Sequence, residues 1–171
     1  MFLAQFAHMA TNQKRIAFGW NGTLIPEVGE FRCDPPKGVH ALVFKRGLRC
    51  GALSLMRTLQ QEGWEIWIYT LGELPVRSVR LFFALNGISL GGIITGHEHQ
   101  SAVRLGLAPR TSIKHAPAFD LDLIVDDKDV TVQAGRRYGF DTLTATNCHK
   151  DWTAAIRLRC LSSATSLRLA A

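Results

Sequence analysis

RIAFGWNGTL, residues 15–24, begins as an apolar run and turns polar at Asn21-Gly22-Thr23. A short apolar run that ends in a glycine-containing turn is typical of a buried strand followed by a loop. A second run of this kind, Leu123-Ile124-Val125, ends in Asp126-Asp127. Ligands of open parallel sheets bind beyond the carboxyl ends of the strands. We therefore expect the polar residues that follow these two strands to lie at one ligand-binding edge.

Strand-like and helix-like segments alternate along the rest of the chain. Further strands are predicted at residues 64–70, 92–95 and 141–145, and helices at residues 49–62, 75–86, 130–138 and 151–161. The helices have apolar residues at helical spacing, or a start or stop signal such as Pro75 or Asn86-Gly87. Alternation of this kind predicts an α/β fold, in which helices cover both faces of a parallel sheet.

The chain has 171 residues, which is the size of one ordinary domain. We predict an N-terminal extension at residues 1–13, a single α/β domain at residues 14–161 and a tail at residues 162–171. Hydrophobic residues at 47% and charged residues at 20% exclude global disorder. No apolar run approaches the roughly 18 residues that cross a bilayer, and residues 1–10 lack the basic start of a signal peptide. A cytoplasmic location without membrane contact is therefore expected.

Four short motifs follow one another along the chain. They are Gly19-x-Asn21-Gly22-Thr23, the strand that ends at Thr70, Lys114, and the strand that ends at Asp126-Asp127. In this order they resemble the four motifs of the haloacid dehalogenase superfamily, whose first motif reads Asp-x-Asp-Gly-Thr. The resemblance covers residues 14–152, and four motifs in order are more specific than any one alone. It implies a three-layer, Rossmann-like version of the α/β fold.

The chemistry of that superfamily assigns a role to each motif. The first Asp attacks phosphorus to give an aspartyl-phosphate, and the second Asp is the general acid and base. Thr and Lys hold phosphate oxygens, and the acid of the fourth motif helps to bind magnesium. The site residues that the resemblance implies are, for phosphate, Thr70, Lys114 and the backbone amide of Gly22 and, for Mg²⁺, Asp126, Asp127 and the backbone carbonyl of Asn21.

This sequence departs from the resemblance at both acids of the first motif. Gly19 stands at the position of the nucleophile, and Asn21 stands at the position of the general acid and base. Glycine offers neither a nucleophile nor a magnesium ligand, and an amide cannot shuttle a proton. Loss of a covalent nucleophile can lower kcat by about a millionfold, as measured in a serine protease. We therefore assign no catalytic residue and expect ordinary aspartyl-phosphate phosphatase activity to be absent or very weak.

The spacing of the motifs also limits the architecture. About 25 residues separate the first motif from the helix predicted at residues 49–62. That length allows a hairpin flap with its turn at residues 34–38, but not a cap domain. The segment between Thr70 and Lys114 is filled by two predicted helices and a strand. We therefore expect a capless domain with an open site, and open sites in families of similar shape accept large substrates or dock partners.

The net charge of +6 is unevenly distributed along the chain. Six basic residues and two acids lie between Arg136 and the last residue. They predict a basic C-terminal face that includes Arg157, Arg159 and Arg168, with Trp152 as its one aromatic residue that could stack on a base. Nucleic acid is therefore one candidate partner of this face, and the alternative is a solvated helix surface.

The leading hypothesis is a catalytically degenerate haloacid dehalogenase-like protein that acts as a binding or regulatory module, with another protein as its partner. It would retain binding of an anion such as a phosphate-bearing ligand, or of Mg²⁺ weakened by the missing first-motif carboxylate. One alternative is a metal-dependent phosphohydrolase in which Asp126 or Asp127 orients an attacking water. A second alternative is a nucleic-acid-binding protein that uses the basic C-terminal face. The sequence leaves open whether the chain is an enzyme, although the two missing acids favour a non-enzyme.

Overall fold

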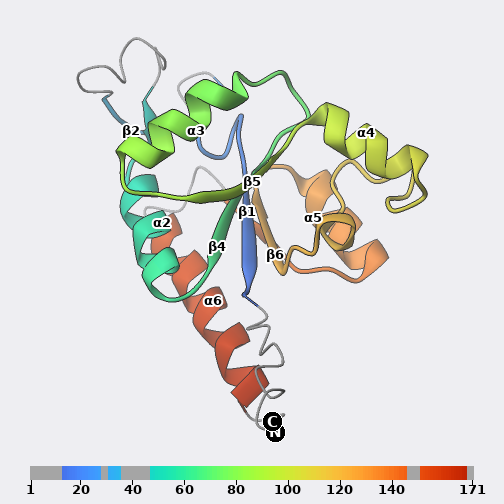
Figure 1. Ribbon diagram of the computed structural model, residues 1–171. Helices are drawn as coiled ribbons and strands as arrows, with labels where there is room; N and C mark the ends of the chain where they lie inside the picture. Colours follow the sequence, from blue (N-terminus) through green and yellow to red (C-terminus); the bar gives the residue numbers. More distant parts are fainter. Residues whose placement is uncertain (1–12, 28–30, 36–46, 146–150, 169–171) are drawn as a thin grey trace, which may run out of the picture.

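A computed structural model describes residues 13–27, 31–35, 47–145 and 151–168, with side chains of the last helix described as far as residue 162. Five strands form one parallel sheet in the order β5-β4-β1-β6-β7 (Figure 1). They are β1 (Arg15–Gly19), β4 (Glu65–Tyr69), β5 (Leu90–Ile94), β6 (Leu123–Asp126) and β7 (Thr142–Thr144). The predicted α/β class with a parallel sheet is therefore confirmed.

The central strand β1 is apolar because both of its faces are covered. Ile16, Ala17 and Phe18 are fully buried, as expected for an inner strand of a parallel sheet. The chain leaves β1 toward β4 and β5 on one side and later returns to β6 and β7 on the other. Strand order reverses at β1, so the carboxyl end of β1 is the switch point at which α/β sheets bind ligands.

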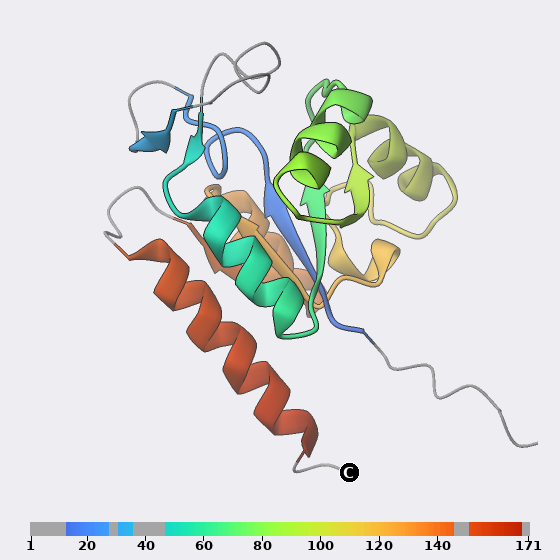
Figure 2. The same cartoon turned by 60° about the vertical axis from the view of Figure 1, so that its left-hand side comes forward.

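Helices cover both faces of the sheet and complete the three layers. They are α2 (Ala52–Gln61), α3 (Val76–Leu85), α4 (Gly96–Arg104), α5 (Asp129–Tyr138) and α6 (Trp152–Arg168), with a short 3-10 helix η1 (Ala116–Phe119). Side chains of α2, α3 and α6 pack with Ile16 and Phe18 in the larger core cluster. Ala17, on the opposite face of β1, packs in a smaller cluster with residues of η1. Figure 2 shows α2 and α6 side by side over the first of these faces.

A two-stranded antiparallel sheet lies apart from the main sheet. It pairs β2 (Cys33–Asp34) with β3 (Leu48–Arg49). The predicted hairpin flap is therefore present as a strand pair, but the prediction that the turn begins at residue 34 is wrong, because Asp34 belongs to β2. The predicted helix at residues 49–62 correspondingly begins only at Ala52. Most of the predicted turn, residues 36–38, lies outside the described residues.

The last helix is longer than predicted. The sequence pattern ends it at Leu161, whereas the backbone of α6 stays helical to Arg168. Residues 162–168, assigned to a tail, are therefore helical in backbone. Within the described residues, no helix combines the length and the apolar character that crossing a bilayer requires.

Gly92 in β5 lies at a point of the sheet where a neighbouring side chain leaves no room for a Cβ atom. A Cβ atom at Gly92 would lie 2.0 Å from the ring of Trp67 on β4. The Trp67 indole is fixed because its Nε1 donates to Glu65 Oε2 at 3.0 Å. We expect Gly92→Ala to lower the free energy of unfolding by about 1–3 kcal/mol through overpacking, measured by urea denaturation. Gly72→Ala is the control, since its nearest neighbouring atoms lie 3.8 Å away, and an equal loss in both variants would contradict this explanation.

Candidate functional site

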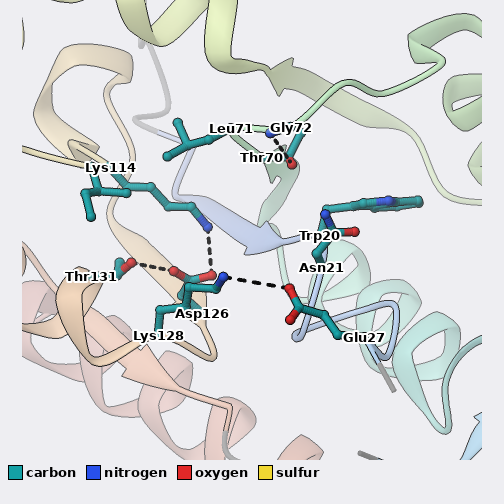
Figure 3. A pocket seen from close by; sticks show the side chains of 11 residues that line it. Trp20, Asn21, Glu27, Thr70, Leu71, Gly72, Lys114, Asp126, Lys128 and Thr131 are labelled. Atoms are coloured by element: carbon teal, nitrogen blue, oxygen red, sulfur yellow. Dashed lines mark hydrogen bonds and ion pairs between the residues drawn. The ribbon is translucent and has the colours of Figure 1, made fainter. Parts of the chain in front are cut away.

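A pocket opens at the carboxyl ends of the central strands, where the switch point predicts it. Its volume is about 130 Å³. Of the six residues that the sequence implies for ligands, four line it (Figure 3): Asn21, Thr70, Lys114 and Asp126. Phe18 lies beside Val125 in the parallel register of β1 and β6, so the residues that follow them in the chain lie at the same edge of the sheet. The remaining lining residues are Trp20, Glu27, Leu71, Gly72, Ile113, Lys128 and Thr131.

Asp126 is the centre of the hydrogen-bonded part of the site. Its Oδ1 accepts from the Lys114 ammonium at 2.7 Å, and its Oδ2 accepts from the Thr131 hydroxyl (Figure 3). The hydroxyl of Thr23 lies 3.4 Å from the same Oδ1. Asp126 is 3% exposed and Lys114 is 6% exposed. The two charges therefore form a buried ion pair that is supported by the Thr131 hydroxyl group.

Gly19 lies next to this ion pair. A Cβ atom built on Gly19 would be 2.3 Å from Asp126 Oδ1 and 2.6 Å from Thr23 Oγ1. The space that the first atoms of a side chain would need is thus taken by a carboxylate and a hydroxyl group. The position that resembles the nucleophile of the superfamily has neither a side chain nor room for one in this arrangement.

Gly22 and Asp127 do not line the pocket. The Gly22 amide donates to the Ile25 carbonyl at 2.8 Å, which satisfies the backbone donor that was expected to face phosphate. Asp127 lies against Gly22, where a Cβ atom would meet its Oδ2 at 2.2 Å, and its Oδ1 accepts from Thr23 at 2.9 Å. Burial raises the pKa of Asp127 above its ordinary range, and the neighbouring Asp126 charge adds to this effect.

Asn21 and Thr70 offer polar groups to the pocket from its two sides. Asn21 is exposed and stands in the loop after β1, where its backbone bridges to Ile25. Thr70 is buried directly after β4, and its Oγ1 accepts from the Gly72 amide at 3.2 Å. The Thr70 hydroxyl thus holds the following loop in place in addition to facing the pocket.

A buried network fixes the backbone around Lys114. The Ser112 hydroxyl donates to the Lys114 carbonyl at 2.5 Å, and the His115 amide donates to the Tyr69 hydroxyl at 3.2 Å. His99 joins these elements, because its Nδ1 lies 2.7 Å from the Tyr69 hydroxyl and its Nε2 lies 3.0 Å from the Ser112 carbonyl. The Lys114 ammonium lies 5.6 Å from the centre of the Tyr69 ring. Lys114 is therefore held in place from both sides.

The residues that support the charged pair were not among those predicted from the sequence. Thr23 stands within the first motif, and its place in that motif is a signal that could have singled it out. Thr131 lies in the first turn of α5, five residues after Asp126, and no local pattern distinguishes it from an ordinary helix residue. The network of Tyr69, His99 and Ser112 joins three separate segments, which only the fold brings together.

The His99 network gives a pH dependence of stability. Burial lowers the pKa of His99 below its ordinary value of 6.5. The unfolded chain therefore takes up the proton first as pH falls, so the free energy of unfolding is expected to decrease from about pH 6.5 down to the folded-state pKa of His99. Urea denaturation at several pH values measures this decrease.

The matched variants for this pH dependence lie on the same helix. His99→Gln should show a weaker decrease, part of which stays because burial also lowers the pKa of His115. His97→Gln should behave like the unchanged protein, since the His97 side chain is 80% exposed. An unaltered pH dependence in His99→Gln would contradict the assignment.

The basic C-terminal face has less free charge than the sequence suggests. Arg157 pairs with Glu62 at 2.8 Å, and Arg159 pairs with Asp141 at 2.6 Å. Trp152 is buried, and its indole Nε1 donates to the Cys50 carbonyl at 3.0 Å, so Trp152 is not a surface for base stacking. The side chain of Arg168 lies outside the described part of α6. These contacts give no support to the nucleic-acid alternative.

Comparisons with known proteins give matches only among solved structures. No family model matches this sequence, and no curated protein matches it. A hydrolase from Streptococcus pneumoniae TIGR4 is similar with a TM-score of 0.52 and 12% identity, over 89% of this chain and 99% of that chain. A similarity at this identity shows a shared fold.

Two further structures resemble the chain more loosely. D,D-heptose 1,7-bisphosphate phosphatase from B. bronchiseptica, complexed with magnesium and phosphate, has a TM-score of 0.47 and 15% identity, over 77% of this chain and 79% of that chain. A chain of the Pnkp1/Rnl/Hen1 complex has a TM-score of 0.49 and 12% identity. That match covers 78% of this chain but only 46% of that one, less than half its length. The similarity to the S. pneumoniae hydrolase shows a fold in common, an α/β fold with a parallel sheet of the kind that the four motifs imply.

Proposed function

We propose that this chain is a non-catalytic haloacid dehalogenase-like module that binds a partner at the strand-end pocket. The observation that carries the proposal is the lack of a side chain at Gly19. No carboxylate is present there, and the adjacent space is taken by Asp126 and Thr23. An aspartyl-phosphate needs a carboxylate at this position, so the chain lacks the group on which turnover of that kind depends.

The direct-water alternative is weakened by the same contacts. It requires Asp126 or Asp127 to orient a water molecule as a base. Both oxygens of Asp126 accept from protein donors, and its charge is balanced by Lys114. Asp127 accepts from Thr23 outside the pocket lining. Asp126 is therefore tied to Lys114 and Thr131, and Asp127 lies outside the pocket lining, which makes both carboxylates poorly placed for that task.

The pocket surface favours another protein as the partner. Leu71 and Ile113 line the pocket and are 43% and 41% exposed. The charged lining residues balance, with Lys114 and Lys128 against Glu27 and Asp126. Lys128 Nζ also lies 3.7 Å from Glu27 Oε1. An open polar pocket without excess positive charge, flanked by exposed apolar side chains, fits a protein surface better than a phosphate dianion.

A phosphatase assay tests the loss of catalysis. The purified chain is incubated with p-nitrophenyl phosphate and a panel of phosphorylated compounds, with and without divalent metals. We expect rates at the background level, unchanged in Asp126→Asn. Turnover above background that disappears in Asp126→Asn would show an enzyme and end the proposal.

Partner binding is tested by two matched surface changes. Ile113→Asp alters the exposed apolar surface at the pocket, and Leu158→Asp alters an equally apolar, exposed position on α6. We expect Ile113→Asp to abolish co-purification of the physiological partner and Leu158→Asp to leave it intact. If Leu158→Asp abolished co-purification and Ile113→Asp did not, the partner would bind at α6 instead of at the pocket.

A further inference from the structure

The last helix, α6, carries apolar side chains on two opposite faces. Trp152, Ile156 and Cys160 recur every four residues and are buried in the core, where α6 packs against α2. Leu158 and Leu161 lie on the other side of the helix, because residues between the buried positions point away from them, and they are 71% and 49% exposed. A surface helix ordinarily has one apolar face and one polar face. The outer leucines of α6 are therefore available to a second molecule.

We propose that the outer face of α6, formed by Leu158 and Leu161, is the interface through which two copies of this chain form a dimer. In a two-fold dimer the same surface patch of both copies meets itself. Such a patch must be apolar enough to gain from burial, and it must not bring like charges together. The outer face of α6 meets both conditions.

The arginines that neighbour these leucines are neutralised within their own chain. Arg157 pairs with Glu62 at 2.8 Å, and Arg159 pairs with Asp141 at 2.6 Å. Each positive charge therefore already has a negative partner before a second copy arrives. Two outer faces of α6 can meet without placing unbalanced positive charges opposite one another, and like charges at that place would disfavour association.

The other exposed pair of leucines on a helix lacks this balance. Leu81 and Leu85 on α3 are 58% and 57% exposed. The same helix carries Arg77 and Arg80 and no acid, and within the part of the chain that the structure describes no ion pair joins either arginine to a carboxylate. Arg80 donates to the neutral carbonyl of Leu90 at 3.2 Å. Two copies that met through α3 would bring uncompensated arginines together, so charge favours α6 for self-association.

The length and position of α6 also suit a helix pair between two copies. It has 17 residues, whereas α2 beneath it has 10, and in Figure 1 and Figure 2 it runs past the end of α2. At the usual rise per residue α6 is about 25 Å long. The pocket at the strand ends is lined by residues outside α6. A dimer through α6 therefore leaves the pocket of each copy open.

Analytical ultracentrifugation of the purified, unchanged chain tests the dimer without any other component. The weight-average mass is measured from micromolar to millimolar protein. We expect it to rise from 18.9 kDa toward twice that value as the concentration increases. A mass that stays at 18.9 kDa throughout would overturn the inference, and the outer leucines would then serve a different molecule.

A matched pair of variants locates the interface. Leu158→Asp would place a carboxylate of each copy in the apolar contact, and we expect it to weaken dimerisation by at least about tenfold. Leu81→Asp makes the same change at an exposed position on α3 and should dimerise like the unchanged chain. Because both positions are exposed, both variants should keep the Tm of the unchanged monomer. A dimer that survives Leu158→Asp, or one that only Leu81→Asp dissociates, would show that α6 is not the interface.

Salt separates an apolar interface from an ionic one. Since Arg157 and Arg159 are paired within their own chain, added NaCl should leave the dimer intact or strengthen it slightly. Dissociation of the dimer by NaCl would show that charges across the interface hold it together, which contradicts the assignment to the outer face of α6.

The dimer goes beyond the proposed function, and the two can fail separately. Ile113→Asp, which alters the pocket, should still dimerise, and Leu158→Asp should be monomeric while it still binds the partner. A chain that is monomeric at every concentration would end this inference and leave the non-catalytic module intact. Phosphatase turnover would end the proposed function and leave the dimer intact.

Discussion

Lys114→Met is expected to lower the free energy of unfolding by about 3–5 kcal/mol, because it leaves the Asp126 carboxylate buried without its partner. The two groups are 2.7 Å apart, and their side chains are 8% and 4% exposed. The remaining close donor to Asp126 is the neutral hydroxyl group of Thr131, which stabilises a carboxylate less than a charged donor does.

Urea denaturation of three variants separates this effect from loss of side-chain volume. Lys128→Met removes a lysine whose pair with Glu27 is exposed and should cost about 0–1 kcal/mol. The double variant Lys114→Met, Asp126→Leu should recover much of the loss, because an apolar pair of similar volume can replace a buried ion pair. If Lys114→Met costs no more than Lys128→Met, the buried pair does not stabilise the fold in this way.

The sheet could be predicted from the sequence because each central strand is apolar and each is bounded by a turn signal. β1 and β6 are buried on both faces, so their apolar runs are continuous and easily recognised. The start of β5 was predicted two residues late, at Gly92 instead of Leu90. Glycine has a low strand propensity, and its presence there is explained by the Trp67 ring that packs over it. This contact joins two strands and leaves no local signal.

The end of α6 shows a different limit of sequence analysis. Serine and threonine, which are poorer helix formers than alanine or leucine, fill four of the five positions after Leu161, where the predicted helix ends. The backbone nevertheless continues as a helix to Arg168. An apolar pattern predicts where a helix packs, and it does not predict how far the helical backbone continues beyond it.

Of the residues that the motifs imply for ligands, Thr70, Lys114 and Asp126 line one pocket, whereas Gly22 and Asp127 lie outside it. Thr70 and Asp126 meet there because the carboxyl ends of parallel strands lie at one edge of the sheet. The motifs also implied that Lys114 faces phosphate and Asp126 faces a metal. In the structure the two residues face each other. The missing carboxylate at Gly19 is visible in the sequence, whereas the rearrangement of its neighbours depends on side-chain positions that no motif encodes.

An aspartate at the position of Gly19 is also expected to lower the free energy of unfolding strongly. In Gly19→Asp the new Cβ atom would start 2.3 Å from Asp126 Oδ1 and 2.6 Å from Thr23 Oγ1. Overpacking of this kind costs about 1–3 kcal/mol. The new carboxylate would in addition share one ammonium with Asp126, and two like charges at one site disfavour ionisation of both. We expect a total loss of about 3–5 kcal/mol in unfolding free energy, measured by urea denaturation.

Gly19→Ala separates the two causes, since it introduces the Cβ atom without the charge and should lose only the overpacking part. The double variant Gly19→Asp, Asn21→Asp should have no phosphatase activity. Asp126 and Thr23 fill the space that the nucleophile needs, and Lys114 is already paired with Asp126. A double variant that folds as stably as the unchanged chain and hydrolyses p-nitrophenyl phosphate would show that these side chains give way. In that case only the two substitutions, and not the packing around them, separate this chain from an active enzyme. Equal stability of Gly19→Ala and Gly19→Asp would instead mean that steric crowding alone excludes the nucleophile, with no share for charge.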